Sequence, residues 1–458
     1  MIKLREYQNK SFNDVRNCFK DGIKKVLLCV PTGGGKTIIF SHMVAETLKN
    51  NFNVIVLVHR DSLFKQTSKT LQNFNVDHGL IGSGYTPNYN KNAQVAKVGT
   101  LVNRLDKFKP HLIIVDEAHH ATAGQYKKII EAYPNAYILG VTATPCRTDG
   151  TGLGLIFDKL IQGPTIQQLI DLGWLVAPRI FAPPIGIDLT SVKKTGGDYN
   201  KGDLLTVMDK PIITGDAVKH YTRICAGVPA VAFCVSIKHA EHVAESFALA
   251  GYKTACVHGK MKQSEIDHIL NGLGNGTYEI VTSCDLISEG TDIPAIGCAI
   301  LLRPTMSLSL FLQQVGRALR LSDGKTEAVI LDHVGNVMRH GHPCDDREWS
   351  LEGMKKKKRD KEMEAAVTIK ECENCYNVYH STLSACPECG TVPIIKERKL
   401  DTVDGELEEL KRIELEEKKA KKREVGRART LEELKRIEKE RGYKSGWAWH
   451  RFNSRKKH

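Results

Sequence analysis

The chain has 458 residues, of which 41% are hydrophobic and 26% charged, and it carries a formal net charge of +13 at pH 7. This length exceeds one ordinary hydrophobic core and predicts two domains of about 150 to 200 residues with an additional segment. The composition excludes a fibrous or largely disordered chain, and no apolar run reaches the roughly 18 residues of a membrane-spanning helix. Because the first five residues also lack a secretory signal, we expect a cytoplasmic protein.

Positive charge is densest near the C-terminus, where residues 351–458 hold 28 Lys and Arg against 21 Asp and Glu. A basic chain suggests a polyanionic partner, although ribosomal and membrane-surface proteins are also basic. The chain contains 13 cysteines. Because a reducing cytoplasm disfavours disulfide bonds, metal binding explains clustered cysteines better.

Short apolar runs alternate with helical stretches between residues 26 and 139. Because these runs are continuous rather than alternating, they are typical of strands covered on both faces in a parallel α/β sheet. The runs are Val26–Val30, Val54–Val58, Leu112–Val115 and Tyr137–Leu139. We therefore predict a first α/β lobe over residues 1–180.

A glycine-rich loop, Pro31-Thr32-Gly33-Gly34-Gly35-Lys36-Thr37, follows the first of these strands and opens a helix. This context predicts a phosphate-binding loop, in which backbone amides and the helix N-terminus surround the phosphates of ATP. Lys36 would reach the β- and γ-phosphates, and the Thr37 hydroxyl would bind Mg²⁺. The usual pattern begins with glycine where this chain has Val30, and a glycine-rich turn without function is the alternative.

Two consecutive carboxylates, Asp116 and Glu117, follow the strand Leu112–Val115. They would repel each other unless a cation shares the site, and Mg²⁺ bound to ATP provides one. We predict that Asp116 holds Mg²⁺ and that Glu117 accepts a proton from the attacking water as general base. An acidic surface turn is the alternative.

With Ala118 and His119, these carboxylates form a DEAH-type box, and residues 1–350 resemble the helicases of superfamily 2. The resemblance implies two tandem RecA-like P-loop lobes with parallel sheets, which hydrolyse ATP between them and move along a nucleic acid. It also implies that Gln8, in the segment Leu4–Gln8, reads adenine. Thr142 and Thr144 are implied to couple hydrolysis to movement of the lobes.

A second series of apolar runs predicts a second lobe of the same kind over residues 216–350, after a connector over 181–215. The runs are Ala230–Val235, Thr254–Val257, Glu279–Thr282, Cys298–Leu302 and Ala328–Leu331.

This second lobe contains Gln313-Gln314-Val315-Gly316-Arg317-Ala318-Leu319-Arg320. On a helix, Arg317 and Arg320 would share a face and could point at one anion, although such a pair is otherwise typical of a solvated face. By resemblance they are arginine fingers that stabilise the transferring γ-phosphoryl group when the lobes close. The resemblance also places Gln313 near the γ-phosphate, and Gly290 and Asp292 near the ribose and phosphates.

A nucleic-acid path across both lobes, opposite the ATP cleft, is implied as well, with contacts that position the backbone without reading sequence. The matching side chains are Arg60, Thr100, Ser236, Lys260 and Thr282. Each of them could instead be a cap, a turn residue or an exposed base.

Two Cys-x-x-Cys pairs, Cys372 with Cys375 and Cys386 with Cys389, are separated by ten residues. Four thiolates at this spacing predict a zinc ribbon within residues 351–400, which also contain a basic linker. A redox pair or an iron site is the alternative. The ribbon would be structural, and its fold would depend on Zn²⁺.

Residues 401–458 are predicted to form a charged helical tail. Its first helix covers residues 406–423, and Thr430-Leu431-Glu432-Glu433 forms a capping box that begins a second helix. The last residues mix aromatic side chains, such as Trp447 and Trp449, with basic ones. This mixture suits stacking on a nucleic acid or docking of an amphipathic helix on the lobes.

Two lobes, a four-cysteine ribbon and a charged tail resemble the RadD-type helicases of bacteria and their phage relatives. The segments Gly196–Asn200 and Arg303–Thr305 strengthen this resemblance. It implies an ATP-dependent DNA helicase or translocase that unwinds or remodels branched DNA in replication, recombination or repair. The expected location is the cytoplasm of a bacterial or phage-infected cell.

Three alternatives stay open: an RNA helicase, a duplex translocase that does not separate strands, and a non-enzymatic scaffold. The DEAH-type box favours DNA over RNA, and the presence of all the catalytic residue types disfavours a scaffold. We expect ATP, Mg²⁺ and Zn²⁺ as cofactors, and DNA as the main partner, together with replication or repair proteins. We also expect a monomer without membrane contact.

Overall fold

The computed structural model describes residues 2–122, 124–147, 149–182, 192–195, 198–208, 211–284, 286, 296–353, 369–372, 374, 377–380, 383–392, 430–440, 446 and 448–449. The chain forms two compact units, Met1–Pro393 and Ile394–His458. The first unit contains both predicted lobes.

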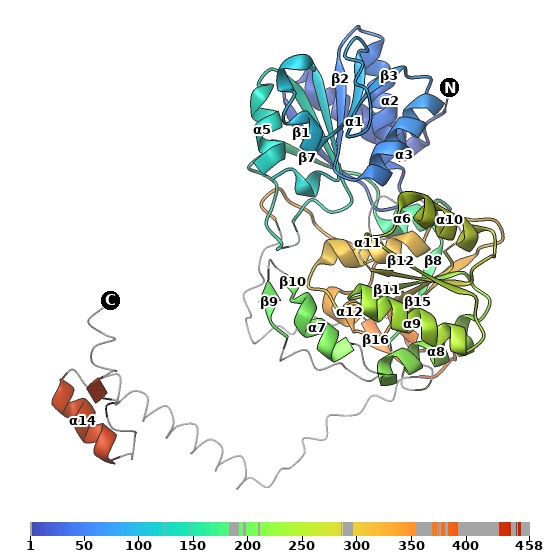
Figure 1. Ribbon diagram of the computed structural model, residues 1–458, viewed down its shortest axis with the longest axis vertical. Coiled ribbons are helices and arrows are strands. Elements are labelled where there is room, and N and C mark those ends of the chain that lie inside the picture. The colour runs from blue at the N-terminus through green and yellow to red at the C-terminus, as the bar shows by residue number, and fades with distance from the viewer. Residues whose placement is uncertain are drawn as a thin grey trace. The chain divides into compact units, whose positions relative to one another are not determined.

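The first sheet has seven parallel strands in the order β3-β4-β2-β5-β6-β1-β7. The lobe that contains this sheet is drawn in blue to teal in Figure 1. The strands are β1 (Lys25–Cys29), β2 (Val54–Val58), β3 (His78–Ile81), β4 (Ala93–Lys97), β5 (Leu112–Asp116), β6 (Tyr137–Thr142) and β7 (Lys159–Gln162). Every residue of β2 and β5 is buried. Strands covered on both faces, as the continuous apolar runs predict, are therefore confirmed.

Helices cover both faces of this sheet because successive side chains of a strand point to opposite faces. Val26 and Leu28 of β1 share a core cluster with residues of three helices, α1 (Glu6–Lys20), α2 (Lys36–Leu48) and α3 (Asp61–Asn73). Leu27, which lies between them, belongs to the opposite cluster with residues of α4 (Val98–Leu101), η2 (Ala118–His120) and α5 (Gly124–Ala132). A short helical turn, η1 (Leu105–Lys107), lies between α4 and β5.

The second sheet has eight strands in the order β12-β13-β11-β14-β15-β8-β17-β16. Six of them are parallel, namely β8 (Ala177–Phe181), β11 (Ala230–Cys234), β12 (Thr254–His258), β13 (Ile280–Cys284), β14 (Cys298–Leu301) and β15 (Glu327–Asp332). Because β8 pairs with β15, β8 belongs to the second sheet. β8 therefore crosses the boundary between lobe and connector that we predicted at residue 180.

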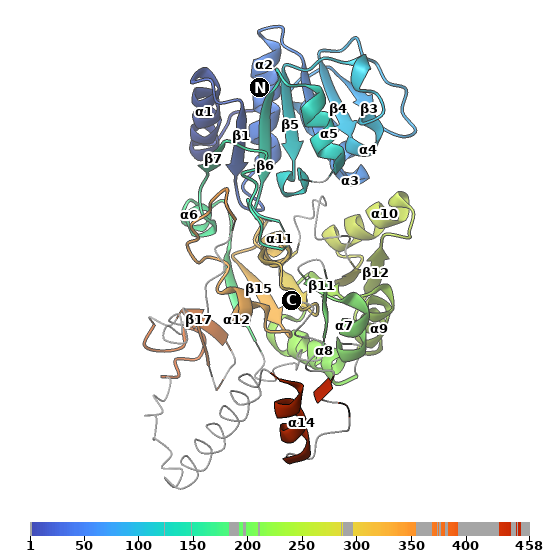
Figure 2. The ribbon, with the colours of Figure 1, turned by 90° about the vertical axis from the view of Figure 1, so that its left-hand side faces the viewer.

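The helices of the second lobe also lie on two faces of their sheet (Figure 2). Residues of α8 (Pro211–Cys225) and α9 (Ile237–Leu249) pack in one core cluster. Residues of α10 (Gln263–Gly274), α11 (Leu308–Ala318) and α12 (Asn336–His340) pack in the other cluster, as do residues of α6 (Ile166–Asp171) and α7 (Lys201–Met208). The connector contributes a small hairpin of β9 (Lys194–Thr195) and β10 (Asp198–Tyr199).

A segment after α12 returns to the first lobe. Gly154 N donates a hydrogen bond to the Leu351 carbonyl at 2.8 Å, and Thr151 pairs with Gly353. A Cβ atom on Gly152 would lie 2.0 Å from the Leu351 carbonyl oxygen, so this close approach requires glycine. The two lobes are thus joined by this segment as well as by the chain between β7 and β8.

The C-terminal part adds a hairpin to the second sheet. β16 (Ile369–Glu371) and β17 (Asn377–His380) are antiparallel, and β17 pairs with β8. In the second unit, α14 (Leu431–Glu440) follows Thr430, whose hydroxyl accepts a hydrogen bond from Glu433 N, so the predicted capping box is confirmed. The predicted helix over 406–423 lies outside the described residues. In the part of the chain that the structure describes, no helix has the length and apolar character to cross a membrane.

Candidate nucleotide and metal sites

The glycine-rich loop connects β1 to α2 and turns through two glycines at positive φ. Gly33 has φ 86° and Gly35 has φ 77°, a region that side chains other than glycine rarely adopt. Gly35 is the N-cap of α2, so the free amides of the first helical turn face the loop. A Cβ atom on Gly35 would also lie 2.4 Å from Gln8 Nε2. The loop therefore has the backbone that an anion-binding turn requires.

A cavity of about 380 Å³ opens at this loop, between the two lobes. It brings together most of the predicted nucleotide residues. From the first lobe it is lined by Thr32, Gly33, Gly35, Lys36, Thr37, Asp116 and Glu117, and from the second by Gln313, Arg317 and Arg320. Gly34 and Gln8 are not among its lining residues. Gly290 and Asp292 lie outside the described residues.

Asp116 and Glu117 lie at the end of β5, and both are buried. Burial and the neighbouring Glu117 raise the pKa of the Asp116 carboxyl well above its usual range. Glu117 has φ 51°, a left-handed conformation that is strained for a residue other than glycine. Strained backbone and two acidic groups beside Lys36 are features of a site that binds a charged ligand.

A chain of side-chain contacts connects Glu117 to the second lobe. His119 Nδ1 lies 3.4 Å from Glu117 Oε2 and 3.2 Å from Thr142 Oγ1. Thr142 Oγ1 donates to the Thr144 carbonyl at 2.9 Å, and Thr144 Oγ1 donates to Ser309 Oγ of α11 at 2.6 Å. Sequence reasoning missed Ser309, because nothing in its local pattern marks it as the partner of a threonine 165 residues away.

Arg317 and Arg320 both line the cavity, but they do not share one helix. α11 ends at Ala318, and Arg320 lies beyond it in an antiparallel bridge with Leu175. The interpretation that both arginines lie on one helical face is therefore wrong. The reason is that backbone pairing with the segment before β8 ends the helix early.

α11 also approaches the glycine-rich loop directly. A Cβ atom on Gly316 would lie 2.7 Å from Thr32 Cβ, so a larger residue could not fit without a shift. Gln313 is buried on the cavity, and its Nε2 has no hydrogen-bond partner among the described residues. Gln313 can therefore offer a donor to a ligand in the cavity.

Arg5 and Trp174 line the cavity, whereas Gln8, the predicted adenine contact, does not. The Arg5 guanidinium carbon lies 3.6 Å from the centroid of the Trp174 ring. Gln8 is buried, and its Oε1 accepts a hydrogen bond from Arg5 N at 3.0 Å. Sequence reasoning missed Trp174, for which the only signal was a large aromatic residue in a short segment between the two sheets.

Four predicted nucleic-acid residues follow the carboxyl ends of strands and are at least partly exposed. They are Arg60 after β2, Thr100 in α4 after β4, Ser236 after β11 and Lys260 after β12. Thr282 differs, because it is fully buried in β13 and its hydroxyl donates to the Ala240 carbonyl at 2.8 Å. Its side chain does not reach the surface, so we do not retain Thr282 as a nucleic-acid contact.

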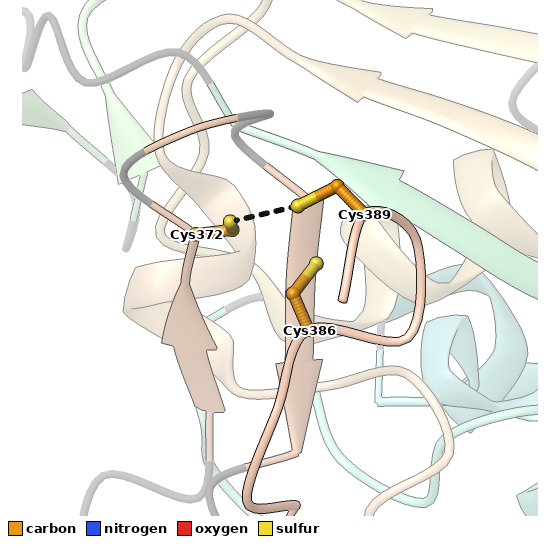
Figure 3. Close-up of side chains that lie close together, drawn as sticks. All are labelled: Cys372, Cys386 and Cys389. Atoms are coloured by element: carbon orange, nitrogen blue, oxygen red, sulfur yellow. Dashed lines mark hydrogen bonds between the residues drawn. The ribbon is translucent and has the colours of Figure 1, made fainter. Parts of the chain in front are cut away.

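Three of the four predicted metal-binding cysteines lie together beside β17 (Figure 3). The sulfur atoms of Cys372, Cys386 and Cys389 are all within 4.8 Å of one another, and Cys375 lies outside the described residues. Asn377 Nδ2 donates to Cys386 Sγ at 3.8 Å. Three thiols this close, one of which accepts an N–H donor, fit a soft metal ion such as Zn²⁺.

The cysteine cluster is attached to the second sheet. Arg179 of β8 forms ion pairs with Glu327 of β15 at 2.5 Å and with Glu388, which lies between Cys386 and Cys389. Together with the pairing of β17 and β8, this contact fixes the hairpin to the lobe.

Comparison with protein families gives two matches. Residues 1–147 match the family described as "Type III restriction enzyme, res subunit". Residues 217–322 match "Helicase conserved C-terminal domain". The matched ranges contain the glycine-rich loop and the two acidic residues in the first lobe, and Arg317 and Arg320 in the second.

The relatives that are more than 30% identical to this chain include a phage protein and a yeast protein. A 51.5 kDa protein of a Lactococcus phage (isolate 7-9) is 33% identical over 363 residues, which cover 79% of this chain and 76% of the phage protein. The "Putative ATP-dependent helicase IRC3" of Saccharomyces cerevisiae is 32% identical over 354 residues, or 72% of this chain. The chain spans only 51% of that yeast protein.

Solved structures show the same fold. The "putative HsdR subunit of a type I restriction enzyme" from Vibrio vulnificus, solved as a fragment, has a TM-score of 0.60 at 22% identity, with coverage of 74% of this chain and 66% of that one. The restriction-modification enzyme LlaBIII bound to DNA has a TM-score of 0.55 at 18% identity, with coverage of 73% and 28%. With the two sheets of mainly parallel strands, these matches confirm the prediction of two tandem RecA-like lobes.

Proposed function

Since the chain belongs to the superfamily 2 helicases and is an ATP-hydrolysing enzyme, we propose that it is a RadD-like DNA helicase or translocase with a DEAH-type box. It unwinds or remodels DNA, preferably branched DNA, in replication, recombination or repair. The observation that supports this most strongly is the cavity between the lobes, where a P-loop and two carboxylates meet two arginines. Such a cavity lets ATP hold the lobes together and lets hydrolysis release them.

The first lobe binds the nucleotide. The amides of the loop from Thr32 to Gly35 and the N-terminus of α2 surround the phosphates, and Lys36 neutralises the β- and γ-phosphates. Thr37 and Asp116 would hold Mg²⁺, which supplies positive charge to the phosphate oxygens. Glu117 accepts the proton of the attacking water.

The second lobe completes the site when the lobes close. Arg317 and Arg320 stabilise the charge that develops on the γ-phosphoryl group, and Gln313 donates its free amide proton there. Gly290 and Asp292 are proposed next to the ribose and phosphates. Gln8 supports adenine recognition by holding Arg5, whose guanidinium and the Trp174 ring offer the base a flat surface.

Hydrolysis is coupled to movement of the lobes through the contacts of Thr142, Thr144 and Ser309. These contacts connect Glu117 to α11. A nucleic-acid strand would be held across the carboxyl ends of both sheets. The contacts that we propose for it are Arg60, Thr100, Ser236 and Lys260. These groups can bind phosphates and would position the strand without reading its sequence.

DNA is the proposed substrate because the chain has a DEAH-type box and because residues 1–147 match a family of restriction enzymes, which act on DNA. An RNA helicase and a duplex translocase without strand separation use the same ATP site and are the alternatives. The protein would work as a monomer in the cytoplasm of a bacterial or phage-infected cell, with replication or repair proteins as further partners.

Cys372, Cys375, Cys386 and Cys389 are proposed to bind one structural Zn²⁺ ion. The three described sulfur atoms support this, because thiolates at such short distances repel one another without a cation. The ion would stabilise the hairpin against the edge of the second sheet.

The test is the ATPase rate of the purified protein at one fixed salt concentration, without nucleic acid and with single-stranded DNA, linear duplex, forked DNA or RNA. We expect the strongest stimulation by forked DNA. Stimulation by RNA alone would replace the DNA proposal with the RNA alternative. Stimulation by forked DNA without strand separation in a parallel unwinding assay would favour the translocase.

A further inference from the structure

Lys325 lies in a tight turn directly after Arg320. Lys325 N donates to the Ser322 carbonyl at 3.1 Å, and Gly324 has φ 72°, which permits the chain to reverse. The reversal brings the half-buried Lys325 side chain back under the end of α11. The turn therefore directs the Lys325 side chain toward the last residue of α11.

The Lys325 ammonium group donates to three backbone carbonyls. Two of them belong to Ile296, at 2.6 Å, and Arg320, at 2.7 Å, and the third belongs to Ala318. An ammonium group has three donors, so all of its hydrogen-bonding capacity is used. Ala318 is the last residue of α11, where carbonyls lack partners within the helix and a cation is favoured.

These contacts hold a part of the chain that α11 itself does not hold. Arg320 lies beyond the end of the helix, so helical hydrogen bonds do not fix its backbone. The contacts that help to fix it include the bridge to Leu175 and the hydrogen bond from the Lys325 ammonium to the Arg320 carbonyl. Leu175 also meets the glycine-rich loop, since a Cβ atom on Gly33 would lie 2.7 Å from Leu175 Cδ2.

We propose that Lys325 is a positioning residue that orients Arg320 toward the γ-phosphate by holding the backbone between α11 and the following turn. The inference rests on the proposed function, in which Arg320 stabilises the transferring phosphoryl group. Lys325 also ties this backbone to Ile296, the residue that follows the segment containing Gly290 and Asp292. One side chain thus connects two parts of the second lobe that are proposed to face the nucleotide.

The placement of Lys325 carries an electrostatic cost. Burial and the nearby Arg320 lower the pKa of Lys325 to about 8, so the charged form is disfavoured here relative to water. The hydrogen bonds to three carbonyls offset part of this cost, because hydrogen bonds to the charged form of a group favour that form.

The test is a double-mutant cycle on Lys325→Met and Arg320→Ala. For each single variant and for the double variant, one measures kcat and KM for ATP with saturating forked DNA, the Kd of a fluorescent ATP analogue, and the thermal unfolding midpoint. Lys127→Met is the matched control, because Lys127 lies in α5 and its side chain is 67% exposed. Lys325→Gln, which retains two amide donors, is a second variant in case Lys325→Met does not fold.

We expect Lys325→Met to lower kcat about tenfold, equivalent to about 1.4 kcal/mol, with little change in KM or in analogue binding. In the Arg320→Ala background the same change should cause no further loss, because the residue through which Lys325 acts is absent. Losses that multiply in the double variant would overturn the proposal, as would an unchanged kcat in Lys325→Met. A wild-type protein that nucleic acid does not stimulate would instead contradict the proposed function.

Discussion

Thr144 Oγ1 and Ser309 Oγ form a hydrogen bond of 2.6 Å that joins the loop after β6 in the first lobe to α11 in the second. Both side chains are buried, so the bond is shielded from water. Thr144 is connected through Thr142 and His119 to Glu117, while Ser309 lies on the helix that carries Arg317. The bond therefore links the proposed general base to a proposed arginine finger.

Ser309→Ala should weaken the coupling between nucleic acid and hydrolysis. The change leaves the buried Thr144 hydroxyl without its acceptor, which costs about 1 to 3 kcal/mol of interaction free energy. The ATPase rate stimulated by nucleic acid should therefore fall about tenfold. Ser309→Thr retains the hydroxyl and should retain most of the stimulation. Ser246→Ala, which removes a hydroxyl from α9 that does not line the cavity, is the control. The measurement is the ratio of ATPase rates with and without forked DNA, and an unchanged ratio in Ser309→Ala would contradict the role.

Gly316→Ala should hinder closure of the cleft. The added Cβ atom would lie 2.7 Å from Thr32 Cβ, so α11 and the glycine-rich loop would have to separate. Such overpacking costs about 1 to 3 kcal/mol, and both a higher KM for ATP and a lower kcat should result. Gly274→Ala is the control, because Gly274 is also helical but has open space at its Cβ position. Equal kinetics for the two variants would show that the contact with Thr32 is not needed for turnover.

Glu117→Gln should bind ATP and nucleic acid yet lose turnover by orders of magnitude, because an amide cannot accept the proton of the attacking water. Single-turnover hydrolysis separates this step from nucleotide binding. Glu131→Gln, on the exposed surface of α5, is a control for the charge change alone. Turnover near the wild-type rate in Glu117→Gln would remove Glu117 as the base.

The double variant Cys372→Ser, Cys375→Ser should contain one zinc ion per chain fewer than the wild type. The zinc content of each protein is measured with a colorimetric chelator after denaturation. ATPase without nucleic acid should be retained, because none of the three described sulfur atoms lines the nucleotide cavity. Cys18→Ser, which alters a thiol on α1, should release no zinc. Simultaneous loss of zinc and ATPase would mean that the second lobe depends on the ribbon for its fold.

His333 should make the protein less stable in acid. Burial and then the nearby His220 lower the pKa of His333 to about 3, whereas an unfolded histidine has its ordinary pKa of about 6.5. The unfolded chain therefore binds the proton more readily, and stability is lost as pH falls below 6.5, by about 2 kcal/mol at pH 5. His333→Gln should flatten this part of the stability profile in denaturant titrations between pH 7 and 5. Exposed His268→Gln should keep the wild-type slope, and the same slope in both variants would contradict the prediction.

Much of the fold was predictable because the signals are local. Continuous apolar runs predicted the buried parallel strands, and the spacing of glycines, Lys36 and Thr37 predicted a turn from β1 into α2. Asp116 and Glu117 could be placed beside that loop because the carboxyl ends of parallel strands lie on one edge of a sheet. Each of these inferences needs only neighbouring residues and the geometry of one sheet.

Contacts between distant segments could be decided only by the tertiary structure. The pairing of Leu175 with Arg320 ends α11 before the arginine that the spacing had placed on it, and Thr282 is inside the core although its sequence position matched a surface contact. The partnership of Thr144 with Ser309 depends on how two lobes meet. Sequence spacing determines which residues share an element, whereas the packing of elements far apart in the chain determines which residues share a site.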